Sequence, residues 1–358
     1  MGSRKKLKSD VRAFAKLHQR DHHEEVRKLL RKGGHTIKEI AEAVNLTEAL
    51  ASAVVTDLQH SNTNIKTSGE RISIAPHPEP ASIEGHKLEL ETDAHGWIYV
   101  GAVADSHLGS KFERLDCLNA MYDKFAAEGI ETVLHAGNWI EGEDHHKAPS
   151  HELVAHGVDG QLSYLAEKYP RRDGITTYAV TGDDHEGWFQ QKLGVDIGKA
   201  AEQEFRAVGR HDWVNLGYQC AYVKLIHAAS KKWGTLQLEH PGGGSSYADS
   251  YVVQKIIESL DGGEKPSVAL FGHYHKQGCF NYRNVWAVLV PCTKDQDSFA
   301  RKKRLRYVKG GCIIGMHLDK RTGAVDEFIW RPTQFFNKGF YDDRWDLRKP
   351  TKPRVEKW

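Results

Sequence analysis

Acidic residues and histidines gather at four places in this chain, each directly after a short apolar run. The four are Asp105-Ser106-His107, Asp183-Asp184-His185-Glu186, His240 and His273-Tyr274-His275. Carboxylates and imidazoles placed together ligate metals such as manganese, iron or zinc. Three acidic side chains at one turn also repel one another unless a cation, such as a metal ion, neutralises them. The pattern therefore predicts a metal site.

The apolar runs before these groups predict the strands that must position them. We expect strands over residues 97–104, 132–136, 177–181, 235–239, 268–271 and 312–317. Helical stretches alternate with them, which is the pattern of an α/β fold. Open α/β sheets place their sites at the carboxyl ends of strands, and the first five strands end in candidate groups. The strand 132–136 ends in Gly137-Asn138.

Five strand-end groups in this order resemble the calcineurin-like metallophosphoesterase family, in particular its repair-nuclease-like members of phage and bacterial type. The family pattern is D-x-H, G-D-x-x-[DE], G-N-H-[DE], a single H and G-H-x-H, and the resemblance covers residues 97–318. It implies an α/β fold, a four-layer sandwich of two mixed β-sheets flanked by helices. It also implies two divalent metal ions: manganese first, with iron, zinc, nickel or magnesium as alternatives.

By position, the resemblance assigns roles to individual residues. The first metal takes Asp105, His107 and His275, the second takes Asp184, His240 and His273, and Asn138 bridges them. His185 would protonate the leaving oxygen or stabilise charge on the phosphoryl group. Asp183 and Glu186 would orient the ligands from behind.

Two positions depart from the family pattern. Asn138 stands where the family has a bridging Asp, and Asp184 stands where it has an Asn. A neutral amide bridges two cations less well than a carboxylate does. One interpretation is an inactivating substitution, natural or introduced, and the other is a charge swap in which Asp184 restores the lost negative charge. The sequence leaves both open.

Residues 22–75 predict a small helical unit ahead of the sandwich. An amphipathic stretch ends at Gly33-Gly34, a capping box at 36–39 opens a second helix, and 47–59 form a third. A hairpin over 64–74 follows. This order resembles a winged helix-turn-helix, with 47–59 as the recognition helix. Because that helix opens with Thr47-Glu48-Ala49, we do not expect base-specific reading, and protein docking or dimerisation is the alternative.

The other segments are set apart by composition. Residues 1–21 are a basic extension, 76–95 a Pro-rich linker, 96–332 the metallophosphoesterase domain, and 333–358 an aromatic and basic tail. That tail suits either base stacking or packing against the domain or a partner. A basic run follows the last motif, and we expect it to bind a phosphate backbone near the metals through Arg301, Lys302, Lys303 and Arg304.

Composition narrows the class of protein. The chain has 358 residues, 39% hydrophobic and 27% charged, with a net charge of +2, which predicts a soluble protein of about two domains. No apolar run is long enough for a membrane span, and no secretory signal is recognisable, so we expect a cytoplasmic protein. The 5 cysteines are scattered, which favours a reducing compartment over a zinc-thiolate site.

Three functional hypotheses follow. The favoured one is a two-metal phosphodiesterase acting on DNA, as an endo- or exonuclease, with either of the two interpretations of Asn138 still open. The second is a phosphomonoesterase on a small or protein-bound phosphate, and the third is a non-catalytic DNA-binding regulator. DNA is favoured because the helical unit, the basic run and the tail all suit nucleic acid. A homo-oligomer, or a partner in repair or replication, is a further expectation.

Overall fold

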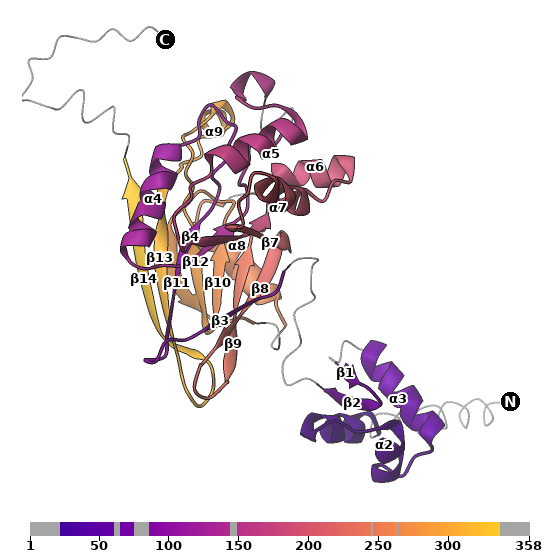
Figure 1. Ribbon diagram of the computed structural model, residues 1–358. Helices are drawn as coiled ribbons and strands as arrows, with labels where there is room; N and C mark the ends of the chain where they lie inside the picture. The colour runs from indigo at the N-terminus through magenta and orange to yellow at the C-terminus, as the bar shows by residue number, and fades with distance from the viewer. Residues whose placement is uncertain are drawn as a thin grey trace, which may run out of the picture. The chain divides into compact units, whose positions relative to one another are not determined.

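The computed structural model describes residues 22–60, 65–74, 86–143, 149–244, 246–261, 263 and 265–336. The chain divides into two compact units, a smaller one that contains the described residues 22–60 and 65–74 and a larger one that contains most of those from residue 86 onward (Figure 1). None of the helices in the described ranges combines the length and the apolar character needed to cross a membrane.

The smaller unit contains, within its described residues, three helical segments and a hairpin. The helices are 22–32, α2 (Ile37–Ala43) and α3 (Glu48–His60). The predicted capping box opens α2, since the Thr36 hydroxyl accepts a hydrogen bond from the Glu39 N–H at 3.2 Å and the Glu39 carboxylate accepts from the Thr36 N–H at 3.0 Å.

Strands β1 (Ile65–Ser68) and β2 (Arg71–Ile74) of this unit pair antiparallel around a turn at Gly69. His35 extends the hairpin through a bridge to Ile72, and apolar side chains of helices and hairpin share one core. The predicted order of elements is present. A role of this unit on DNA stays a prediction.

The described part of the larger unit contains two six-stranded sheets. The first sheet has the order β14-β13-β4-β5-β6-β7. Its parallel strands are β4 (Trp97–Val103), β5 (Thr132–Ala136), β6 (Thr176–Thr181) and β7 (Trp213–Tyr218). Its antiparallel strands are β13 (Lys309–Leu318) and β14 (Val325–Phe335).

The second sheet has the order β11-β12-β10-β9-β8-β3. At its centre β9 (Trp233–Glu239), β10 (Val268–Phe271) and β12 (Val285–Leu289) run parallel. The remaining strands are β3 (Leu88–Glu91), β8 (Cys220–Ile226) and β11 (Gly278–Tyr282). Because β9 and β10 are parallel neighbours, their carboxyl ends lie side by side, as do those of β4, β5 and β6.

Apolar side chains define four layers. One core lies between the sheets and contains Val100 and Leu134 from the first together with Leu236 and Leu270 from the second. Helices cover the outer face of the first sheet, namely α4 (Leu115–Ala127), α5 (Gly157–Lys168), α6 (Glu186–Leu193) and α7 (Ile197–Ala207). Helix α8 (Tyr251–Ser259) packs on the outer face of the second. The predicted α/β sandwich of two mixed sheets flanked by helices is confirmed (Figure 1).

Two predicted boundaries need correction. Strand β3 lies inside the stretch 76–95 that the sequence suggested as a linker, and it pairs in parallel with β8. Strand β14 runs to Phe335, past residue 332, where the tail was expected to begin. Both are edge strands stabilised by partners distant in sequence, so their local composition does not reveal them. The predicted extension 1–21 and the tail beyond residue 336 lie outside the described residues.

Candidate metal centre

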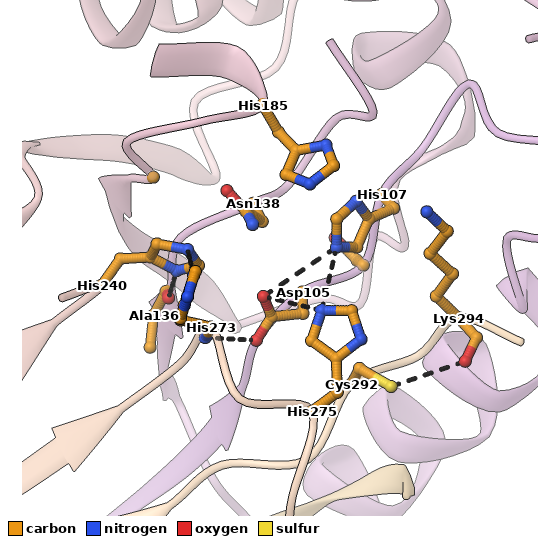
Figure 2. A network of polar contacts seen from close by, with 12 residues as sticks. Asp105, His107, Ala136, Asn138, His185, His240, His273, His275, Cys292 and Lys294 are labelled. Carbon is orange, nitrogen blue, oxygen red and sulfur yellow. Dashed lines mark hydrogen bonds and ion pairs between the residues drawn. The ribbon is translucent and has the colours of Figure 1, made fainter. Parts of the chain in front are cut away.

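The carboxyl ends of five strands from both sheets converge on one site. Asp105 and His107 follow β4, Asn138 follows β5, residues 183–186 follow β6, His240 follows β9, and His273 and His275 follow β10. Figure 2 shows Asp105, His107, Asn138, His185, His240, His273 and His275 gathered around one space. Long-range folding therefore brings together every ligand that the family resemblance implies.

The candidate ligands form two adjoining groups. In the first ligand group, Asp105, His107 and His275 are buried and offer ligand atoms within 4.8 Å of one another. In the second, Asp183, Asp184, His240 and His273 meet the same limit. Asp183 therefore lies among the possible ligands, although the family resemblance implied that it only orients them.

Asp105 links the two groups. Its Oδ1 lies 3.2 Å from His275 Nε2, and its Oδ2 accepts a hydrogen bond from the His273 N–H at 2.9 Å. Burial raises the pKa of this carboxyl, but the neighbouring histidines, His275 first, hold it below its ordinary value. An ionised carboxylate between two sets of imidazoles is a strong ligand for a divalent cation.

The histidines of the second ligand group have their tautomers set by main-chain carbonyls. His240 Nδ1 donates to the Ala136 oxygen at 2.7 Å, and His273 Nε2 donates to the Gly243 oxygen at 2.7 Å. This leaves His240 Nε2 and His273 Nδ1 with lone pairs only 3.3 Å apart. Burial lowers the pKa of His240 to about 4, so it is neutral at pH 7. Two facing lone pairs repel, and a shared cation would turn this repulsion into attraction.

In the first ligand group a carboxylate, and not a main-chain carbonyl, lies behind one imidazole. His107 Nδ1 lies 2.9 Å from Glu141 Oε2, and its Nε2 lies 3.2 Å from His275 Nε2. Burial lowers the pKa of His107 well below its ordinary value. For His275, burial acts in the same direction, but Cys292 and Asp105 outweigh it and raise the pKa to about 10. His107 Nε2, His275 Nε2 and Asp105 Oδ1 therefore face one another within the distance at which they could share a cation.

A buried ion cluster supports His107 from behind. Lys294 is 1% exposed, and its Nζ donates to both oxygens of Glu141, at 2.7 and 2.8 Å, and to Asp297 Oδ2 at 2.7 Å. The main-chain oxygen of Glu141 also accepts from His185 Nδ1 at 2.6 Å. Glu141 therefore contacts both a candidate ligand and the candidate acid. Lys294 could not be recognised from the sequence, because it lies in a polar stretch that resembles an ordinary loop.

Asn138 occupies the bridging place with an unsatisfied oxygen. Its side chain is buried, and its Oδ1 has no hydrogen-bond partner in the described structure. A Cβ at Gly182 would stand 1.9 Å from that oxygen, so the glycine leaves room for the amide. An unpaired buried acceptor costs roughly 1–3 kcal/mol, which a bound cation would remove.

Glu186 holds the loops that carry Asn138 and Gly182 together. Its Oε1 accepts from the Asn138 N–H at 2.8 Å and from the Gly182 N–H at 2.6 Å. Burial raises the pKa of Glu186 to about 8, despite these hydrogen bonds. It therefore acts on the centre through the backbone, consistent with the orienting role that the resemblance implies.

Backbone strain is concentrated in the same residues. Positive φ angles, unusual for residues other than glycine, occur at Asp105 (50°), His107 (49°), Asn138 (53°), His273 (75°) and His275 (52°). Each such conformation costs on the order of 1–3 kcal/mol and persists where the surrounding structure enforces it. Strain at five candidate ligands points to a functional centre, because a core built for stability alone has no need of it.

The centre opens into a cleft of about 910 Å³, which we call the metal cleft. Asn138, Asp184, His185, His273 and His275 line one part of it. Basic and aromatic residues line another part, namely Tyr247, Phe299, Lys303, Arg304, Arg306 and Tyr307. Of the four predicted nucleic-acid contacts, Lys303 and Arg304 thus share a cleft with the ligands. Arg301 lines a neighbouring cleft, and Lys302 lines neither.

No protein-family model and no curated protein matches this chain. Among solved structures, an archaeal phosphodiesterase is 12% identical to this chain, with a TM-score of 0.36. The match covers 66% of this chain and 100% of the phosphodiesterase. YfcE, a phosphoesterase from E. coli, is 11% identical to this chain, with a TM-score of 0.31. The match covers 65% of this chain and 98% of YfcE. Zinc-complexed Vps29 from Entamoeba histolytica is 12% identical to this chain, with a TM-score of 0.31. The match covers 66% of this chain and 99% of the Vps29 chain. Values this low assign neither a family nor an activity.

Proposed function

We propose that this chain is a two-metal phosphodiesterase that hydrolyses DNA, with manganese as the first candidate metal. The observation that carries the proposal is two adjoining ligand groups, with lone pairs turned inward, at a cleft with a basic wall. When bound, two divalent cations would polarise the phosphoryl group and activate a water molecule for in-line attack.

His185 is placed to handle the leaving group. Its Nδ1 donates to the Glu141 main-chain oxygen, so its Nε2 is the nitrogen available to the cleft that it lines. An imidazole held in this way can donate a proton to the leaving oxygen. Its ring centroid lies 4.3 Å from that of His107, which places this proton donor beside the first ligand group.

The walls of the metal cleft favour a nucleic acid over a small phosphomonoester. Lys303, Arg304 and Arg306 supply positive charge for backbone phosphates, and the rings of Phe299 and Tyr307 lie among them. Tyr247 adds a fully exposed ring from the loop after β9. Aromatic rings interleaved with basic side chains stack bases while the cations hold phosphates. A single phosphate would use only the metal end of this cleft.

Hydrolysis of three substrates tests the proposal. With Mn²⁺, the chain should nick plasmid DNA and hydrolyse bis-p-nitrophenyl phosphate faster than p-nitrophenyl phosphate, and excess EDTA should stop both reactions. His185→Asn should slow DNA cleavage by about 10²-fold or more. His211→Asn, at an exposed position outside the metal cleft, is the matched control.

The other hypotheses give different results. Hydrolysis of the monoester alone would indicate a phosphomonoesterase. Binding of DNA without cleavage of any substrate, even by the Asn138→Asp variant, would indicate a non-catalytic DNA-binding protein. Either result would overturn the proposal.

A further inference from the structure

A second cleft, of about 630 Å³, adjoins the metal cleft. The two clefts share Arg304, Arg306 and Tyr307 in their walls, so they meet along the segment that follows α9 (Ser298–Lys303). Arg301, Lys309 and Asp295 line the second cleft but not the first. We call this second cleft the side cleft. A ligand that fills the metal cleft can continue into it without leaving the protein surface.

The side cleft carries an excess of positive charge. Four basic side chains line it, Arg301, Arg304, Arg306 and Lys309, against one carboxylate, Asp295. That carboxylate is already engaged, 3.2 Å from Lys309 Nζ and 3.4 Å from Arg114 Nη1. Within the described ranges, no ion pair or side-chain hydrogen bond engages the guanidinium groups of Arg301, Arg304 and Arg306. Unpaired cations in a concave site attract anions.

The arginine-bearing segment is tied to the metal centre at both ends. At its start, Asp297 caps α9 by accepting from the Ala300 N–H at 2.7 Å, and the same carboxylate pairs with buried Lys294. At its end, the Val308 N–H donates to the His275 main-chain oxygen at 2.8 Å. The Tyr307 ring packs against the His275 ring with centroids 4.0 Å apart. The side cleft therefore has a defined position relative to the metal ligands.

We propose that the side cleft binds phosphates of the substrate strand beyond the one being cleaved, so that this chain acts on oligonucleotides in preference to isolated phosphodiesters. This inference rests on the proposed DNA phosphodiesterase function. Repeated negative charge is the chemistry that matches a row of cations leading away from two metal sites. A phosphomonoester, or a diester with no further phosphate, gains nothing from the side cleft.

The test removes the two cations that belong to the side cleft alone. Arg301→Gln/Lys309→Gln leaves the metal cleft residues intact. Lys320→Gln/Arg321→Gln changes the same charge at the exposed turn after β13 and is the control. Binding is measured as fluorescence anisotropy of a labelled single-stranded oligodeoxynucleotide in EDTA, over a series of salt concentrations. Hydrolysis is measured with Mn²⁺ on that oligonucleotide and on bis-p-nitrophenyl phosphate.

We expect the side-cleft variant to bind the oligonucleotide on the order of tenfold more weakly. The slope of log binding constant against log salt concentration should become shallower by roughly 0.7 for each phosphate contact that is lost. Its hydrolysis of bis-p-nitrophenyl phosphate should equal that of the parent and the control. Oligonucleotide affinity and salt dependence equal to the control would overturn the inference. Absence of all hydrolysis in the parent would refute the proposed function, yet the binding comparison in EDTA would still decide whether the side cleft holds a nucleic acid strand.

Discussion

The two ligand groups of the candidate centre are held in place by different kinds of support. In the first, all three side chains are buried, and Glu141 backs His107 while Lys294 fixes Glu141 through two hydrogen bonds. In the second, main-chain carbonyls back the imidazoles, and three of the four side chains are only partly buried. One of those carbonyls belongs to Gly243, at an exposed position in the loop after β9.

The different supports predict that the two ligand groups would bind divalent cations with different affinities. A carboxylate behind an imidazole makes it a more basic ligand, and the buried ion cluster fixes its position. The first ligand group should therefore hold its metal more tightly. The second, which is more open to solvent and substrate, should exchange its metal first. A chelator should therefore remove two metals in two steps.

Asp105→Asn should give the largest effect, because Asp105 contacts both ligand groups. Loss of its charge weakens both metal sites, and hydrolysis of bis-p-nitrophenyl phosphate should fall by on the order of 10³-fold. Metal content, measured by mass spectrometry after dialysis, should drop below one ion per chain. Asp326→Asn, which changes a surface carboxylate that pairs with His317, is the control. Full metal content with full turnover would refute the assignment of Asp105.

Lys294→Met breaks the support of the first ligand group alone. Two buried carboxylates, Glu141 and Asp297, lose their partner, so the variant should be less stable by about 3 kcal/mol or more in urea unfolding. Turnover should fall by roughly 10–100-fold, with loss of one metal rather than two.

Adding Asp297→Asn to Lys294→Met separates the two roles of the lysine. The double variant removes one uncompensated charge, so it should recover part of the stability. It should not recover metal affinity, since Glu141 would still be free to move away from His107. Equal loss of both metals in either variant would contradict the division between the two ligand groups.

Asn138→Asp tests the bridge between the groups. A carboxylate at this place would engage both cations, and the unpartnered Oδ1 shows that the room for a ligand oxygen exists. We expect metal affinity to rise and turnover to increase by about tenfold. Asn284→Asp, in the exposed turn between β11 and β12, is the matched control. Equal turnover of Asn138→Asp and the parent would mean that the charge of Asp184 already compensates for the amide.

The smallest effect concerns pH and His135, which lies under the first ligand group. His135 Nε2 is 2.9 Å from Ser106 Oγ, and burial lowers the pKa of His135 to about 3. The unfolded chain binds this proton near pH 6.5 and the folded chain does not, so stability falls as pH drops from 6.5 toward 3. In the metal-free protein, the free energy of unfolding measured in urea should depend less on pH after His135→Gln. The slope against pH should be smaller by up to about 1.4 kcal/mol per pH unit. If the free energy of unfolding depended on pH in the same way in the parent and in His135→Gln, a neutral buried His135 would be contradicted.

Most of the candidate centre could be predicted from the sequence because its signals are local. Strands β5 and β10 have the predicted bounds, and the ligand residues stand within a few positions of the apolar runs that precede them. An apolar run that stops at a polar cluster can be recognised from a dozen residues. The edge strands β3 and β14 could not be recognised in this way, because each depends on a neighbour in the sheet.

The sequence by itself determined which residue types stand at the strand ends, and hence the chemistry of a metal centre. The tertiary structure decided which atoms face one another. His107 and His275 meet across 168 positions, and Lys294 reaches Glu141 across 153. It also turned the lone pairs of His240 and His273 inward and joined the side cleft to the metal cleft. These features depend on main-chain carbonyls, buried charges and cavities that exist only after the two sheets pack together, so no local pattern encodes them.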